Sequence, residues 1–209
     1  MGTMDKTRFE QGMSYDQYKA GMTRNQEKFI ANEERVRLSQ DDVNAFRARP
    51  LNVMVLAEDW CGDVIANLPV LGVIAMESGA LDLRVFARDQ NSDLMDQYLN
   101  QGKYKSIPVF AFFDPSSWKE VGVFIERPDA VTEMRASKRR EIFAAHPEFG
   151  PPDGAVDQLP DDVRARLSAA LQKMRDDTTD QANAEVVREI RAIAEGKATR
   201  GGARQLAQV

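Results

Sequence analysis

Residues 57–69, AEDWCGDVIANLP, contain the only cysteine of the chain, Cys61, at a predicted junction between a strand and a helix. The preceding residues 51–57, LNVMVLA, form a short apolar run with valines, which is typical of a buried strand. The following residues show a broad apolar helical face that ends near Ser78 and Gly79. Cys61 is therefore expected in the first turn of a helix. Unpaired backbone N–H groups and the helix dipole stabilise a thiolate at such a position.

Further apolar segments extend the predicted sheet. Residues 81–87, LDLRVFA, are expected to form a strand parallel to residues 51–57, because a helix connects the two. A short helix is predicted at residues 91–100. Residues 107–113, IPVFAFF, are strongly strand-like, and residues 119–125 return as an antiparallel partner after a turn. This order predicts an α/β fold with a mixed four-stranded sheet flanked by helices.

Helical segments precede and follow this sheet. Residues 1–48 predict an N-terminal helical segment packed on the core, with a capping box at Ser14 and a helical pattern that continues to Phe29. The central domain is expected at residues 49–148, and it ends with a helix that begins near Pro128. The aromatic face of the N-terminal segment is interpreted as core contact rather than as a binding surface.

A stretch rich in proline and glycine, HPEFGPPDG at 146–154, predicts the end of that domain. Residues 149–195 predict a C-terminal extension of two amphipathic helices, and residues 196–209 predict a disordered tail. The apolar positions are Val163, Leu167, Leu171 and Met174 in the first helix and Val186, Val187, Ile190 and Ile193 in the second. The pattern leaves open whether these helices fold back on the body or form a homodimer with a second subunit.

Composition narrows the class of protein. With 43% hydrophobic and 29% charged residues, the sequence is typical of a soluble globular protein. A net charge of -5 argues against a nucleic-acid partner. No apolar run is long enough for a membrane span and the N-terminus has no apolar signal core, so a cytoplasmic location is expected. One cysteine and one histidine exclude a disulfide framework and argue against a metal site, and we expect no cofactor.

Two motifs resemble the thioredoxin superfamily. WCG at 60–62, with Pro69 eight residues after the cysteine, is similar to the start of the family's W-C-G-P-C motif. KSIPVF at 105–110 resembles the segment in which an X-Pro bond is cis and faces the active cysteine. The resemblance covers roughly residues 50–127. Within the superfamily, the chain looks most like bacterial thioredoxin family proteins that carry E-D-W-C-G-D followed by a segment like residues 88–98. This resemblance implies a thioredoxin-like fold.

Three positions depart from the family's pattern. Asp63 and Val64 stand where thioredoxin has proline and the second cysteine. Val55 fills the position of the buried aspartate that helps to deprotonate that second cysteine. An internal disulfide cannot form, so an ordinary dithiol cycle is excluded.

The first functional hypothesis is a monothiol redox protein. Cys61 would be the catalytic nucleophile, exchanging with a protein disulfide or a low-molecular-weight thiol, and an external thiol would resolve the mixed disulfide. The resemblance implies that the substrate meets the rim formed by Trp60, Gly62, Asp63, Ile107 and Pro108. A cis Pro108 would expose the backbone of Ile107 for pairing with an extended segment.

The second hypothesis is a thioredoxin-fold binding module for a protein partner that has lost catalysis. In that interpretation Cys61 is a small buried apolar residue. The carboxylates Glu58, Asp59 and Asp63 would raise the pKa of the thiol if they face it. Arg127 could offset such a carboxylate, but the base rate for surface arginines favours a solvated residue at the entry of a helix.

Overall fold

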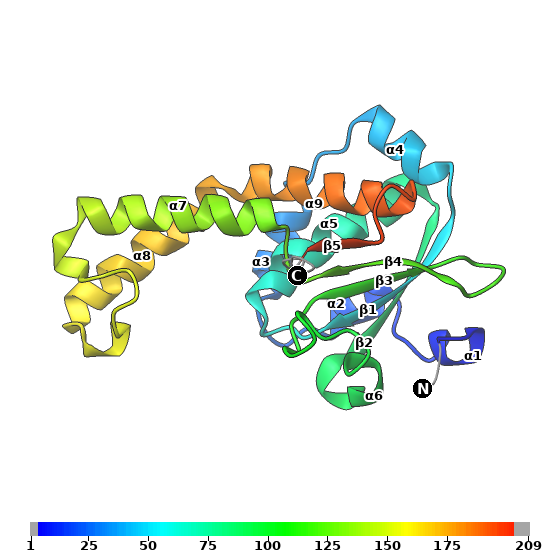
Figure 1. Ribbon diagram of the computed structural model, residues 1–209, viewed down its shortest axis with the longest axis horizontal. Coiled ribbons are helices and arrows are strands. Elements are labelled where there is room, and N and C mark those ends of the chain that lie inside the picture. Colours follow the sequence, from blue (N-terminus) through cyan, green and yellow to red (C-terminus); the bar gives the residue numbers. More distant parts are fainter. Residues whose placement is uncertain (1–3, 203–209) are drawn as a thin grey trace, which may run out of the picture.

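Five strands form one mixed sheet in the computed structural model, which describes residues 4–202 (Figure 1). The order across the sheet is β2, β1, β3, β4, β5. The bounds of the strands are Leu51–Ala57 for β1, Leu81–Ala87 for β2, Val109–Phe113 for β3, Glu120–Ile125 for β4 and Arg200–Gly202 for β5. β1 runs parallel to β2 and antiparallel to β3, and β4 is antiparallel to β3.

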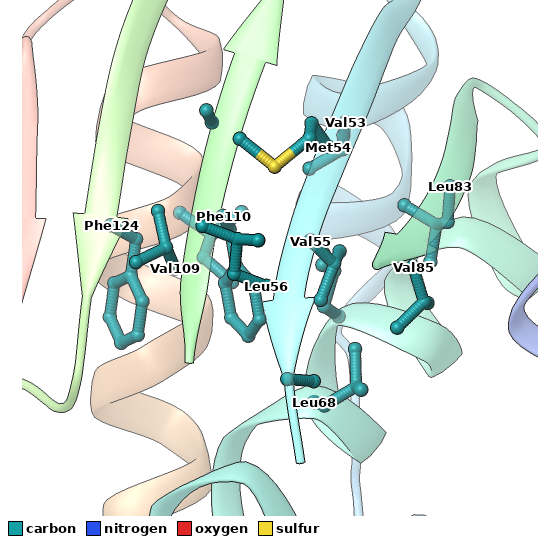
Figure 2. Close-up of a cluster of buried hydrophobic side chains, with 14 of the residues drawn as sticks. Val53, Met54, Val55, Leu56, Leu68, Leu83, Val85, Val109, Phe110 and Phe124 are labelled. Atoms are coloured by element: carbon teal, nitrogen blue, oxygen red, sulfur yellow. The ribbon is translucent and has the colours of Figure 1, made fainter. Parts of the chain in front are cut away.

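The interior strand β1 and helix α5 (Gly62–Ser78) contribute much of the core of the molecule. Val53, Val55 and Phe110 are fully buried, and Figure 2 shows these side chains of β1 and β3 packed together above Leu68 of α5. A strand covered on both faces needs a nearly continuous apolar sequence, which explains the run LNVMVLA. The predicted strand-helix-strand unit is confirmed.

The N-terminal segment folds into short helices, and the helix expected from Ser14 to Phe29 is divided in two. The short helices are α1 (Lys6–Phe9), α2 (Tyr15–Gly21), α3 (Gln26–Glu33) and α4 (Gln40–Arg47). The helical pattern that was expected to continue to Phe29 is interrupted before α3, where Asn25 has a left-handed backbone with φ 57°. α3 and α4 pack against α5, and α2 contacts β2. The predicted capping box at Ser14 is present.

The segment between β2 and β3 is less helical than predicted. A short 3-10 helix, η1 (Arg88–Gln90), is followed by α6 (Ser92–Met95), and the chain then continues through turns to β3. Leu94 and Met95 are buried, so the apolar positions still point into the core.

Two long helices form an arm outside the sheet. α7 (Asp129–Ala145) and α8 (Asp161–Asp177) lie side by side and project from one side of the molecule (Figure 1). The 3-10 helices η2 (Pro147–Phe149) and η3 (Val156–Gln158) lie in their connection. The arm has a small apolar cluster of its own, in which Phe143, Phe149 and Leu167 are buried.

Helix α9 (Thr179–Ala194) returns from the arm to the body and packs against α5, α4 and β4. Its predicted apolar face is buried there, formed by Val186, Val187, Ile190 and Ile193. The second C-terminal helix therefore folds back on its own chain. A homodimer through the C-terminal helices stays a prediction, and the face of α9 is already occupied within the chain.

The predicted disordered tail at 196–209 is wrong in its first part, and the sheet has five strands where four were predicted. β5 pairs parallel with β4, and the Val123 N–H donates to the carbonyl oxygen of Thr199. The close approach depends on Gly122, because an added Cβ there would lie 2.9 Å from that carbonyl oxygen. Residues 203–209 lie outside the described residues. Within residues 4–202, the helices are too short or too polar to cross a membrane.

Candidate functional site

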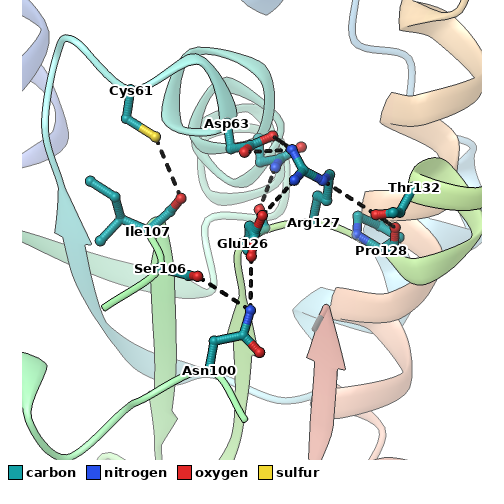
Figure 3. A network of polar contacts seen from close by, with 10 residues as sticks. Cys61, Asp63, Asn100, Ser106, Ile107, Glu126, Arg127, Pro128 and Thr132 are labelled. Carbon is teal, nitrogen blue, oxygen red and sulfur yellow. Dashed lines mark hydrogen bonds and ion pairs between the residues drawn. The ribbon is translucent and has the colours of Figure 1, made fainter. Parts of the chain in front are cut away.

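Cys61 is the N-cap residue of α5, immediately after the loop that follows β1. Its side chain is half-buried, and its thiol donates a hydrogen bond to the carbonyl oxygen of Ile107 over 3.5 Å (Figure 3). The peptide bond between Ile107 and Pro108 is cis. The fold thus brings the two halves of the predicted site together across 46 residues of sequence.

The pKa of the Cys61 thiol is raised above its ordinary value, and burial is the largest cause. The backbone N–H groups of Val64 and Asp63 act in the opposite direction, as expected at a helix N-terminus. The Asp63 carboxylate adds to the rise and the Arg88 guanidinium opposes it. Burial was expected of Cys61 under the second hypothesis, and here burial and Asp63 together outweigh the N–H groups of the helix terminus.

The three neighbouring carboxylates have different roles around the sulfur. Glu58 accepts a hydrogen bond from the backbone N–H of Asp89 at 2.9 Å. Asp59 accepts bonds from the backbone N–H and hydroxyl of Thr23 and ties the loop before α3 to the site. These two acids are engaged in structural contacts. Asp63, in the first turn of α5, is the carboxylate that raises the pKa of Cys61.

Arg127 is not the solvated helix-entry residue that the sequence favoured. Its Nη1 atom lies 2.7 and 2.6 Å from the two carboxylate oxygens of Asp63, and the side chains are only 31% and 20% exposed. The reason is the turn at Glu126, whose left-handed backbone (φ 65°) directs the chain after β4 toward the start of α5. Three influences act on the pKa of Asp63. Burial is the largest and raises it, the Arg127 guanidinium lowers it, and the Glu126 carboxylate raises it.

A polar network extends from this ion pair toward Ile107 (Figure 3). Arg127 also pairs with Glu126, whose other carboxylate oxygen accepts a bond of 2.8 Å from the Asn100 amide. Asn100 is buried, and it donates in addition to the hydroxyl of Ser106, the residue before Ile107. Sequence reasoning missed Asn100, because an isolated asparagine in a polar loop carries no motif.

The exposed rim of the site is formed by Trp60 and Gly62. Trp60 is 44% exposed, and the guanidinium of Arg88 lies 5.0 Å from the centre of its ring. Arg88 also donates to the carbonyl oxygen of Lys105 in the loop before Pro108. Gly62 is exposed, with open space where a Cβ would stand. Arg88 was not among the predicted site residues, although it opens the segment at 88–98.

Two of the three departures from the thioredoxin pattern lie in the core. Val55 and Val64 are both fully buried. Neither side chain has a group that can accept a proton or form a disulfide, so the chemistry of the site rests on the Cys61 sulfur and the polar groups around it.

Comparisons with known proteins agree with the fold. Two solved structures share the fold, both with a TM-score of 0.59: a protein of unknown function from Pseudomonas aeruginosa at 18% identity, and an HIV epitope scaffold at 19% identity. The first comparison covers 93% of this chain and 99% of that chain, and the second covers 91% and 96%. No curated protein matches the chain. A family model described as thioredoxin matches residues 12–139, more than half of the 209 residues, and the chain belongs to the thioredoxin family.

Proposed function

We propose that this protein is a monothiol redox protein that carries out thiol-disulfide exchange through Cys61. The observation that carries the proposal is the position of the sulfur. It is half-buried at the N-terminus of α5, it faces the Ile107 carbonyl at 3.5 Å, and it lies beside the exposed Trp60. A thiolate at this position would be stabilised by the N–H groups of Val64 and Asp63 as it forms.

The reaction has two steps. In the first, the Cys61 thiolate attacks one sulfur of a substrate disulfide, a mixed disulfide forms, and the other sulfur leaves as a thiolate. In the second, the thiolate of a low-molecular-weight thiol attacks the substrate sulfur of the mixed disulfide. The bond to Cys61 breaks, its sulfur leaves as a thiolate, and a new substrate disulfide is released. The sulfur of Cys61 begins and ends the cycle in the same oxidation state.

The raised pKa of Cys61 sets the conditions for this chemistry. The thiol donates to the Ile107 carbonyl, a bond that is lost when the proton leaves, so this contact also favours the neutral form. The fraction of thiolate at neutral pH is therefore small. The thiolate that does form is correspondingly more nucleophilic, because nucleophilicity rises with pKa. We expect the exchange rate to increase with pH beyond the range of an ordinary cysteine.

The substrate is proposed to lie across the open surface at Trp60 and Gly62. Trp60 offers an exposed apolar ring, and Gly62 leaves room beside the sulfur. Ile107 and Pro108 are buried, so they would contribute backbone atoms rather than side chains. Asp63 is held by Arg127 and would contribute charge rather than a direct contact.

A second candidate function is a binding module without catalysis. Two observations favour it: the pKa of Cys61 is raised, and Val55 and Val64 are buried apolar residues where the family's acid and second thiol would stand. In that case the surface around Trp60 would bind a protein partner, and the sulfur would have no role.

The experiment that separates the two functions is reaction of the native protein with oxidised glutathione. We expect a mass increase of one glutathionyl group on wild type, removal of that group by a free thiol, and no adduct on Cys61→Ser. Circular dichroism would show that both proteins remain folded. An adduct that forms only after unfolding would exclude the monothiol function and leave the binding module.

A further inference from the structure

The Asp63 carboxylate is held away from the sulfur of Cys61. Arg127 lies 2.6 to 2.7 Å from both carboxylate oxygens. Figure 3 shows Asp63 directed toward Arg127, while the Cys61 sulfur points toward Ile107. Asp63 raises the pKa of Cys61 even in this pair, and an unpaired carboxylate in the first turn of the helix would repel a thiolate more strongly. The guanidinium supplies the opposite charge at the place where the repulsion would arise.

The same arginine is connected to the segment that contacts the sulfur. Its Nη2 atom pairs with Glu126, and Glu126 accepts from Asn100 at 2.8 Å. Asn100 in turn donates to Ser106 Oγ at 3.2 Å, one residue before Ile107. Asn67 of α5 adds a bond of 2.6 Å to the backbone carbonyl of Glu126. The network therefore joins the helix that carries Cys61 to the loop that carries its hydrogen-bond acceptor.

We propose that Arg127 is a positioning residue for exchange at Cys61. Arg127 compensates part of the charge of Asp63 and keeps that carboxylate directed toward itself and not toward the Cys61 sulfur. Through Glu126 and Asn100 it also fixes the loop that presents the Ile107 carbonyl. This role rests on the proposed function, because it has a consequence only if the sulfur reacts.

Other charged and titratable groups face the two centres and limit the effect of Arg127. Arg135 of α7 lies within electrostatic range of Asp63, and its buried Nε has no hydrogen-bond partner within residues 4–202. Arg88 after β2 lowers the pKa of Cys61, and Tyr18 of α2 also lies within electrostatic range of the sulfur. Loss of Arg127 is therefore expected to weaken the compensation, with part of it retained by Arg135.

The test compares the pH dependence of Cys61 alkylation by iodoacetamide in native wild type and in Arg127→Met. We expect the variant to react about 3- to 10-fold more slowly at neutral pH, the effect of an unpaired like charge near a thiolate. Asp63→Asn should react faster than wild type, because the repelling charge is gone. The double variant should be restored to the wild-type rate or above it, which a loss of packing alone would not produce.

The matched control is Arg191→Met. Arg191 pairs with Asp42 at 2.8 Å, and the side chains are 33% and 21% exposed, close to the values for Arg127 and Asp63. This pair joins α9 to α4, which leads into the start of β1, whereas Cys61 follows the end of β1. Arg191→Met should lose comparable stability and leave the alkylation profile of Cys61 unchanged.

Each outcome bears on a different claim. A reactive wild type with the same profile in Arg127→Met would overturn the positioning role and leave the proposed function standing. A wild-type sulfur that reacts only after unfolding would overturn the proposed function, and the role of Arg127 with it. If Arg127→Met does not fold, Arg127→Gln replaces it, because glutamine removes the charge and keeps a hydrogen-bond donor for Asp63: a slower reaction supports the role, and an unchanged reaction overturns it.

Discussion

Asn183 in α9 donates a hydrogen bond of 3.0 Å to the side-chain oxygen of Asn32 in α3, and both side chains are buried. Asn32 in turn donates to the carbonyl oxygens of Ile65 and Ala66 in α5. The carbonyl of Ile65 needs this donor because Pro69, four residues later, has no N–H to give. Two asparagines thus join three helices at the point where proline interrupts the helix behind Cys61.

Replacing Asn183 by alanine should destabilise the protein. The change leaves the buried oxygen of Asn32 without its donor, which costs about 1–3 kcal/mol. Urea unfolding measures the difference in the free energy of unfolding. Asn44→Ala is the control, because Asn44 is exposed and its loss should stay within about 0.5 kcal/mol. Equal losses at the two positions would contradict the importance of the buried pair.

Two tyrosines on α2 should respond in opposite ways to loss of their hydroxyl groups. Among the residues that the structure describes, the buried Tyr18 hydroxyl has no hydrogen-bond partner, whereas the Tyr15 hydroxyl donates to Glu33 at 3.0 Å. Tyr18→Phe should be neutral or stabilising, because an unsatisfied polar group is removed. Tyr15→Phe should cost about 1.5–3 kcal/mol, the range for a hydrogen bond to a charged group.

Thermal unfolding of the two single variants measures this contrast. The substitutions are chemically identical and lie three residues apart on the same helix, so each serves as the control for the other. A larger loss in Tyr18→Phe than in Tyr15→Phe would show that the Tyr18 hydroxyl has a partner.

Gly72 is the position on α5 where a methyl group should not fit. An added Cβ would lie 2.2 Å from the Tyr15 ring, which is buried and held by Glu33. Alanine would gain about 1 kcal/mol in helix propensity. Overpacking costs typically about 1–3 kcal/mol, so the net effect of Gly72→Ala is expected to be a loss.

Gly21 at the end of α2 is the matched control, because its added Cβ would meet no atom within 4 Å. Gly21→Ala should be neutral or stabilising. Chemical denaturation of both variants compares them, and a stabilised Gly72→Ala would mean that Tyr15 can move aside.

The pH dependence of stability should report the raised pKa of Cys61. A thiol that holds its proton more tightly in the folded state contributes stability below its unfolded pKa of about 8.5. That contribution is lost as pH rises through the folded pKa. Relative to Cys61→Ser, wild type should therefore weaken from about pH 8.5 upward. The two proteins share every tyrosine and lysine, so the difference between their urea midpoints isolates the thiol. A difference that stays constant with pH would contradict the assignment.

The central fold could be predicted because its signals are local. The run before Cys61, the helical face after it and the alternation in β4 each lie within a few neighbouring residues, and they gave the correct elements. β5 could not be predicted, because three residues with two glycines have little strand propensity and depend on the edge of β4.

The motif residues of the candidate site could be predicted from the sequence. The pairing of its charged side chains could not. Cys61 and Ile107 meet as their resemblance to thioredoxin implies. Asp63 and Arg127 lie 64 residues apart in the sequence, and their pairing depends on the backbone turn at Glu126. No local sequence pattern predicts that turn. The burial of the thiol is likewise a property of tertiary packing, and it is the largest cause of the rise in its pKa.

The arm of α7 and α8 is inserted in the chain between strands β4 and β5 of the sheet. The chain leaves the sheet after β4 and returns to it with α9, so the helical hairpin has its own apolar cluster and does not interrupt a strand. Its tip can be lengthened by whole helical turns, or made to carry a fused domain, without changing the register of the sheet. The arm is therefore the natural attachment point for a reporter or a tether in experiments that must leave Cys61 undisturbed.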